Sequence, residues 1–170
     1  MNFLSNYKYK FLFNRFYKNK MSVRKYNLKR SIKKVGIIFE NENYFDENFI
    51  VELIENLSIR RKNIYLMNFG KNFFEFDNSF RFEKGDSSFL GKISGNLRLF
   101  LEADFDLLIN YFNSNSYEIN LFSLKCKKKI SAGFINTDRR VNDIIFNFSP
   151  SKKKLFIKEI SKYVKIEKQL

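Results

Sequence analysis

The apolar positions of the chain change period several times, and each change marks an expected element. The run Val35–Phe39 predicts a buried strand, because short continuous apolar runs are typical of parallel sheets. Asp46 follows as a helix cap, and the next apolar residues have helical spacing, at Ile50, Leu53, Ile54 and Leu57. Residues 64–69 form a second apolar run, so residues 35–69 predict one right-handed β-α-β unit.

The second half of the chain repeats this alternation. Residues 105–112, 130–135 and 144–148 predict strands, with a helix over 116–128. Ser149 and Pro150 predict the start of a last helix, with an inner stripe of Phe156, Ile160, Tyr163 and Val164. The alternation predicts an α/β domain over residues 35–170, with three layers and a mostly parallel sheet, Rossmann-like or flavodoxin-like.

Two segments have weaker patterns. Residues 71–95 contain six Phe without a steady period, which predicts an irregular or hairpin segment over the sheet, with a plain loop at 91–95. Residues 1–20 place aromatic residues four apart, as in Tyr7 and Phe11, which predicts a helix with a broad aromatic side. Residues 21–34 have no clear period and indicate a basic linker.

The charge of the chain is concentrated at its ends. The formal net charge is +14, yet residues 1–34 contain eight Lys, three Arg and no carboxylate, and the first acidic residue is Glu40. Acidic and basic residues nearly balance over 35–150. We therefore divide the chain into a basic, aromatic-rich N-terminal arm (1–34) and a single α/β domain (35–170). Clustered basic segments are typical electrostatic footprints of anionic partners.

The composition excludes several classes of protein. The chain has one Cys and no His, which rules out a disulfide framework and a zinc ribbon. Its abundant Phe, Lys, Asn and Ile have codons rich in A and T, which indicates an AT-rich genome. No uncharged apolar run approaches the roughly 20 residues of a membrane span. We expect a cytoplasmic protein without a cofactor.

One polar loop is a candidate ligand site. It follows a predicted strand end, where open α/β sheets bind their ligands, and it consists of residues 136–143. Adjacent Arg139 and Arg140 could grip a phosphate or carboxylate. The alternative is a turn whose charges pair with one another and hold the loop in place. The candidate residues are Asp138, Arg139, Arg140, Asn142 and Asp143.

Two further features favour a structural interpretation. Asp104 and Asp106 form a D-x-D pair, but they lie at the start of a predicted strand instead of at its end. Cys126 lies among lysines that would lower its pKa, but it falls on the apolar side of its helix and has no His partner.

The arm has three interpretations. Aromatic residues interleaved with cations suit RNA, because its bases can stack on the aromatic rings and its phosphates can be neutralised by lysine and arginine. They also suit an anionic membrane surface. The third interpretation is that the aromatics cover a flank of the domain itself. The candidate anion-binding residues are Lys8, Lys10, Arg15, Lys18, Lys20, Arg24, Lys25, Lys29 and Arg30.

Several motifs resemble those of a family of short uncharacterised proteins from Bacteroidota bacteria. The matching positions are Asp106 to Tyr111 in a strand, Lys125 with Cys126, Gly133, Asp138 with Arg140, Asn142 and Asp143, and Glu159 with Lys162 and Tyr163. The resemblance covers about residues 22–168 and implies an α/β domain with a basic N-terminal extension, without a known activity. A weaker likeness to heptose-adding glycosyltransferases implies shared strand–helix–strand form only.

These observations favour a non-enzymatic adaptor that docks an anionic partner, RNA or the ribosome, through the arm. The first alternative is a peripheral membrane-surface protein. The second is an enzyme or binder for a phosphorylated, nucleotide-sugar-like small molecule at the loop 136–143.

Overall fold

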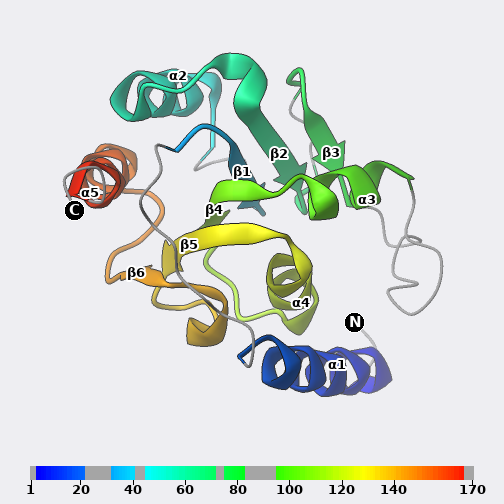
Figure 1. Cartoon of the computed structure of the whole chain (residues 1–170). Helices are drawn as coiled ribbons and strands as arrows, with labels where there is room; N and C mark the ends of the chain where they lie inside the picture. The colour runs from blue at the N-terminus through cyan, green and yellow to red at the C-terminus, as the bar shows by residue number, and fades with distance from the viewer. Residues whose placement is uncertain (1–2, 22–31, 41–44, 72–74, 83–94, 167–170) are drawn as a thin grey trace.

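The described residues form a six-stranded, all-parallel sheet that is covered by helices on both faces (Figure 1). The computed structural model describes residues 3–21, 32–40, 45–71, 75–82 and 95–166. The strand order is β3-β2-β1-β4-β5-β6. The strands are β1 (Val35–Phe39), β2 (Ile64–Asn68), β3 (Ser79–Arg81), β4 (Phe105–Tyr111), β5 (Lys128–Phe134) and β6 (Ile144–Phe146). The expected three-layer α/β fold is confirmed.

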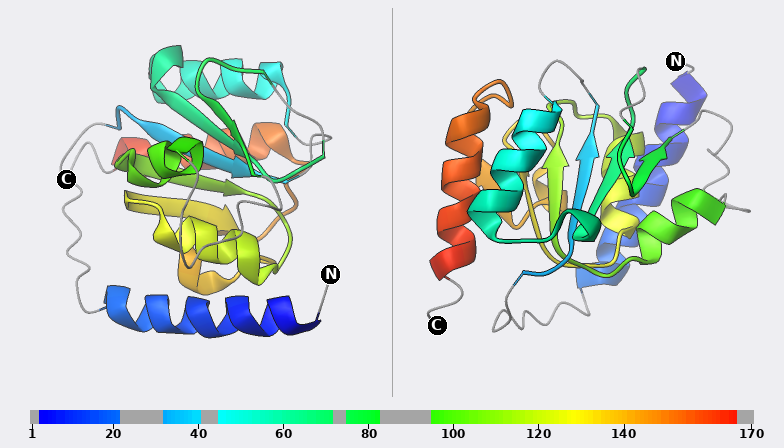
Figure 2. Two further views of the ribbon diagram at one scale, coloured as in Figure 1. Left: turned by 90° about the vertical axis from the view of Figure 1, so that its right-hand side faces the viewer. Right: turned by 90° about the horizontal axis from the view of Figure 1, so that it is seen from above.

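In the described part of the chain, α-helices cover the sheet on both sides. Helices α2 (Glu47–Leu57) and α5 (Lys153–Ile166) cover one face of the sheet. Helices α3 (Gly95–Glu102) and α4 (Tyr117–Lys125) cover the other, and α1 (Phe3–Met21) lies outside α4 (Figure 2). Short 3-10 turns occur at Arg61–Asn63 and Arg139–Val141. Among the described residues, no helix has both the length and the apolar character that a membrane crossing needs.

The alternation of side chains along β4 separates two cores. Leu107, Ile109 and Tyr111 pack with α2 and α5. Leu108 packs on the other face, with α3, α4 and α1, and Phe105 at the start of the strand packs there too, outside the alternation. Both faces of the central strands are therefore buried, which is why these strands read as continuous apolar runs.

The phenylalanine-rich segment differs from its prediction. Residues 79–81 form β3, which pairs parallel to β2 at the edge of the sheet. Because the strands of a hairpin are antiparallel, the described residues of this segment do not form the expected hairpin with β2. Helix α3 begins at Gly95 and was not expected. Phe80 of β3 packs edge-on against Phe100 of α3, with their ring centroids 5.9 Å apart. Of the six Phe in this segment, Phe80 lies in β3 and Phe82 follows it on the same face of the sheet, whereas Phe76 packs in the core on the other face. The remaining three, Phe73, Phe74 and Phe89, lie outside the described residues.

The last helix also begins later than predicted. Ser149 and Pro150 form a turn, and α5 starts at Lys153. The turn is fixed by the Tyr111 hydroxyl, which donates to the Pro150 carbonyl at 2.6 Å. Phe156, Ile160 and Val164 are buried as expected, but Tyr163 is 46% exposed.

Candidate functional site

The strand order reverses between β1 and β4, where doubly wound sheets usually bind their ligands. On the α2 side of this point, aromatic rings fill the space. Phe39 stacks on Phe45 with centroids 4.1 Å apart, and Phe49 packs on Tyr111 at 4.5 Å. Burial raises the pKa of the Tyr111 hydroxyl, which is already committed to Pro150. The described side chains at this position pack against one another instead of lining a ligand site.

On the opposite side, the loop 136–143 lies against β5 through Asn142. A Cβ added at Gly133 would come within 2.6 Å of the Asn142 amide, so glycine permits this close approach. Asn142 accepts a hydrogen bond from the Asn110 side-chain amide at 2.7 Å and donates to the Thr137 hydroxyl at 2.7 Å. Asn142 thus joins the loop to the ends of two strands.

The end of the loop is held in the same way. The Asp143 carboxylate accepts from the backbone N–H of Ser131 at 2.8 Å and from its hydroxyl at 2.7 Å. The same hydroxyl also lies 2.8 Å from the Val141 carbonyl. Asp143 therefore fastens the loop to β5.

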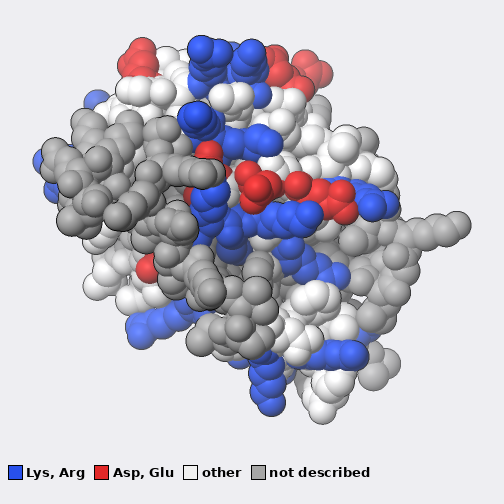
Figure 3. Space-filling model, in the orientation of Figure 1, with Lys and Arg blue, Asp and Glu red and all other residues white. Residues whose placement is uncertain are grey.

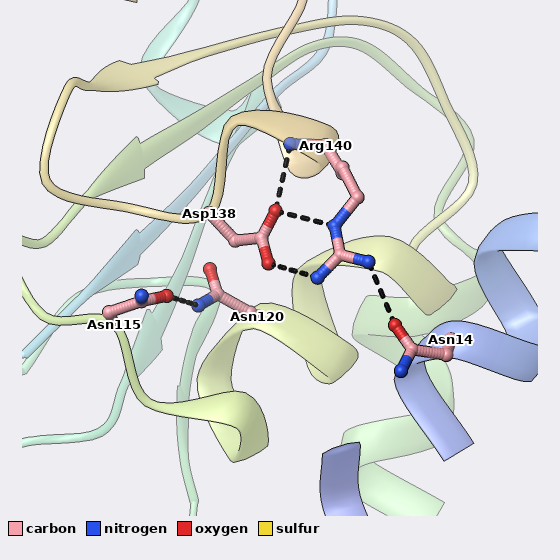
Figure 4. A network of polar contacts seen from close by, with 5 residues as sticks. All are labelled: Asn14, Asn115, Asn120, Asp138 and Arg140. Atoms are coloured by element: carbon pink, nitrogen blue, oxygen red, sulfur yellow. Dashed lines mark hydrogen bonds and ion pairs between the residues drawn. The ribbon is translucent and has the colours of Figure 1, made fainter. Parts of the chain in front are cut away.

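Arg140 and Asp138 form a bidentate ion pair in the middle of the loop (Figure 4). The distances are 2.9 Å from Arg140 Nε to Asp138 Oδ1 and 2.7 Å from Nη2 to Oδ2. Burial alone would raise the pKa of Asp138, but hydrogen bonds from Arg140 outweigh it and the pKa lies below its ordinary value. The same pair raises the pKa of Arg140. The pair is firmly ionised.

The remaining side of the Arg140 guanidinium contacts α1. Its Nη1 donates to Asn14 Oδ1 at 2.8 Å, as Figure 4 shows. The guanidinium also lies 4.5 Å from the ring centroid of Phe13 and 5.5 Å from that of Tyr17. Both contacts are within the range of cation–π attraction. Arg140 thus attaches α1 to the domain.

The inner side of α1 is part of the core. Phe13 is fully buried and Leu12 is 7% exposed, both in the cluster that includes α4. Phe13 packs against Tyr117 of α4, with centroids 6.3 Å apart. Phe13, with Tyr9 and Tyr17 partly buried beside it, therefore covers a flank of the domain, which is part of what the third interpretation of the arm expected.

The outer side of α1 has a different character. Tyr7 is 73% exposed and Phe11 is 62% exposed, one helical turn apart. Lys8, Lys10, Arg15 and Lys18 are also exposed, and α1 contains no acidic residue. On the face of the molecule that Figure 3 shows, acidic and basic side chains lie side by side in the middle, whereas no acidic side chain is visible over α1. We call Tyr7, Lys8, Phe11, Arg15 and Lys18 the outer face of α1.

The other candidate residues divide between exposed and undescribed positions. Arg139 is an exposed residue of the loop 136–143. The side chain of Lys20 lies outside the described part of the structure, as do Arg24, Lys25, Lys29 and Arg30. The structure therefore brings together four of the nine predicted cations of the arm, on one helix.

Asp106 of the D-x-D pair supports the start of β4. Asp106 accepts from the backbone N–H groups of Lys33 and Lys34 at 2.8 and 2.9 Å, and it pairs with the Lys129 ammonium. Burial opposes ionisation, but these partners lower the pKa of Asp106. Among the described residues, no group of three acidic, Cys or His side chains could hold a metal ion.

Cys126 also has the structural role that its position predicted. It is fully buried, and its thiol donates to the Phe122 carbonyl at 3.3 Å.

The sequence analysis did not include Asn14 and Asn110 among the candidate residues. Asn110 could have been noticed, because it is an amide within an otherwise apolar strand, but nothing in the sequence distinguishes Asn14.

Comparison with known proteins places the chain in a family. The model of a family of unknown function, DUF6913, matches residues 8–166, so the chain belongs to that family. No curated protein and no solved structure matches the chain. The match confirms the expected uncharacterised family, while the origin in Bacteroidota stays a prediction. It starts inside α1, upstream of the expected residue 22, so this helix belongs to the matched region.

Proposed function

We propose that this protein is a non-enzymatic adaptor that docks RNA through the outer face of α1. The observation that supports this most is the exposure of Tyr7 and Phe11 among exposed cations on a helix without acidic residues. Aromatic rings offer stacking surfaces to unpaired bases, and lysine and arginine neutralise the phosphates between them.

The spacing of these residues suits a strand of RNA. Tyr7 and Phe11 are four residues apart, which places them on one side of the helix about 6 Å apart along its axis. Lys8, Arg15 and Lys18 recur at helical spacing beside them. A strand that follows this side would meet rings and cations in alternation.

The positions of the apolar side chains of α1 favour RNA over a membrane surface as the partner. Interfacial helices bury a broad apolar face in the lipid, opposite a charged face. In α1 the buried positions, Leu12 and Phe13, pack on the domain. The exposed rings lie among the cations instead of forming a separate apolar face. A membrane surface remains the alternative outcome of the experiment.

RNA is favoured over a phosphorylated small molecule by the state of the loop 136–143. Arg140 donates to Asp138 and Asn14, and Asn142 and Asp143 are bonded to neighbouring strands and loops. A ligand that used these groups would have to break contacts that hold the loop and α1.

The test is binding of the full chain to a fluorescent single-stranded RNA and to vesicles containing anionic lipid. The variant K8Q/R15Q/K18Q removes three exposed cations from α1. Its matched control is K152Q/K154Q/K158Q, which removes three exposed lysines next to and on α5, across the sheet. We expect only the α1 variant to lose RNA affinity. Equal loss in both variants, or binding to vesicles without binding to RNA, would overturn the proposal.

The exposed rings are tested separately. Y7A/F11A leaves every charge in place, so its effect isolates stacking. We expect a loss of about 1–3 kcal/mol per stacked base. Thermal unfolding should be unchanged, because both rings are exposed.

A further inference from the structure

Helices α2 and α5 leave a groove between them, on the face of the sheet opposite α1. Figure 1 shows the two helices together, with the sheet between them and α1. The groove has a volume of about 390 Å³, which is within the range of ligand sites. Its described lining residues all belong to α2 or α5. The groove is therefore a surface separate from the outer face of α1.

Three lysines form the α5 wall of the groove. Lys154, Lys158 and Lys162 are four residues apart, so they follow one side of the helix at intervals of about 6 Å along its axis. All three are exposed. The wall therefore presents a row of ammonium groups along the groove.

The positive charge of this row is only partly neutralised. Lys162 donates to the Glu159 carboxylate at 2.7 Å. Lys154 and Lys158 have no hydrogen bond or ion pair with any described residue. Among the described lining residues, Glu52 is the one carboxylate. The groove therefore keeps a positive charge and attracts an anionic partner.

The opposite wall suits a polypeptide backbone. Asn56 donates its side-chain N–H to the Glu52 carbonyl at 2.8 Å, which leaves its side-chain oxygen as an acceptor. A peptide offers backbone N–H donors to this oxygen and to the Glu52 carboxylate, whereas a phosphate is repelled by the carboxylate. No described lining residue is aromatic, so nucleic-acid bases would have no ring to stack on. The lining therefore favours an acidic peptide over RNA.

The spacing of the lysines fits a peptide in extended conformation. In a strand, side chains two residues apart point to the same side and lie about 6.5–7 Å apart. This distance is close to the interval of about 6 Å between successive lysines of the row. Acidic residues at alternate positions of an extended segment would therefore meet Lys154 and Lys158 in turn.

We propose that the groove between α2 and α5 docks an acidic, extended segment of a partner protein. Lys154 and Lys158 contact its carboxylates, and Asn56 accepts from its backbone. The groove gives the adaptor a second partner, on the face of the sheet opposite the proposed RNA surface. This inference goes beyond the proposed function and does not depend on RNA binding by α1.

The test measures binding of the full chain to two fluorescent peptides of equal composition, Glu-Thr-Glu-Thr-Glu-Thr and Glu-Glu-Glu-Thr-Thr-Thr. The variant K154Q/K158Q removes the two unpaired lysines of the groove. Its matched control, K8Q/K18Q, removes two exposed lysines of α1. Each protein is also titrated with the single-stranded RNA.

We expect the alternating peptide to bind more tightly than the blocked one. K154Q/K158Q should weaken its binding by about 1.4- to 5-fold for each lost ion pair, and K8Q/K18Q should match the wild type. Thermal unfolding of K154Q/K158Q should be unchanged, because both lysines are exposed.

The carboxylate of the groove gives the test a second direction. E52Q removes the charge that opposes an acidic peptide, so it should strengthen binding. Its control is E55Q, which removes an exposed carboxylate of α2 that does not line the groove. E55Q should bind the peptide like the wild type.

The outcomes separate this inference from the proposed function. If the alternating peptide does not bind, or if K8Q/K18Q weakens its binding as much as K154Q/K158Q does, the inference is wrong. A loss of RNA affinity in K154Q/K158Q would show that the groove takes nucleic acid and would also overturn the inference. Peptide binding at the groove by a chain that does not bind RNA would support the inference and overturn the proposed function.

Discussion

Two groups of cations in this molecule have opposite environments. Arg140 lies between Asp138, Asn14 and the ring of Phe13. Arg15 and Lys18 are exposed on the outer face of α1, which contains no acidic residue. The first group holds α1 on the domain, and the second is presented to solvent. Arg140, which is paired with a carboxylate, is thus structural here, whereas Arg15 and Lys18 are exposed on a helix without acidic residues.

The two sides of α1 repeat this contrast with aromatic residues. Phe13 is fully buried and Phe11, two residues earlier, is 62% exposed. If the contrast is correct, substitutions on the inner side should change stability, and those on the outer side should change binding only.

The largest expected effect is that of Phe13→Ala. It removes a buried ring that contacts Tyr117 and Arg140, and should lower the free energy of unfolding by about 3–5 kcal/mol. Urea denaturation of the full chain measures it. Phe11→Ala is the control and should stay within about 0.5 kcal/mol of the wild type. Equal effects would mean that α1 is not docked through its inner side.

The next effect is that of Gly133→Ala. The new methyl group would meet the Asn142 amide, which is buried and bonded to Asn110, so the loop 136–143 must shift. We expect a loss of about 1–3 kcal/mol in the same assay. Gly95→Ala is the control, because nothing lies within 4 Å of its added carbon. A neutral Gly133→Ala would show that the loop is not held on β5.

A third comparison matches two arginines. Arg140→Gln breaks charge-assisted bonds to Asp138 and should lower the free energy of unfolding by about 1.5–3 kcal/mol. Arg15→Gln should leave stability unchanged, because Arg15 is exposed, and should weaken RNA binding. If Arg15→Gln destabilised the chain as much as Arg140→Gln, the division between the two groups of cations would be wrong.

The smallest effect concerns pH. The pKa of Asp106 lies below 3.8 in the folded chain, so the unfolded chain binds the proton more readily. Its contribution to stability is present above pH 3.8 and is lost as the pH falls through the folded-state pKa. Urea titrations between about pH 5 and 2 should show this loss, and Asp106→Asn should reduce it. An unchanged pH dependence in Asp106→Asn would contradict the role of Asp106 at the start of β4.

The sequence predicted the regular elements well and the irregular ones poorly. Val35–Phe39 and the helix capped by Asp46 were clear, because an apolar run and a capping carboxylate act locally. The start of α5 was misplaced, because Pro150 is held by Tyr111, which is distant in the sequence. Strand β3 was missed as a parallel edge strand, since three residues carry too little pattern.

The candidate site was predictable in part. The absence of acidic residues from the arm drew attention to nine cations, and three of them, Lys8, Arg15 and Lys18, lie on the outer face of α1. The sequence left open whether the loop 136–143 binds a ligand or has a structural role. Only the contacts in the fold show that its charged residues pair with one another and with neighbouring elements. Nothing in the sequence places Asn14 beside Arg140, because the contact joins residues 126 positions apart.

The most direct test of the account is the salt dependence of RNA binding by the full chain and by K8Q/R15Q/K18Q. The slope of log K against log salt should become shallower by about 2 in the variant, which is about 0.7 for each lost phosphate contact. The control K152Q/K154Q/K158Q should keep the wild-type slope. Identical slopes in all three proteins would contradict the claim that the outer face of α1 meets the RNA.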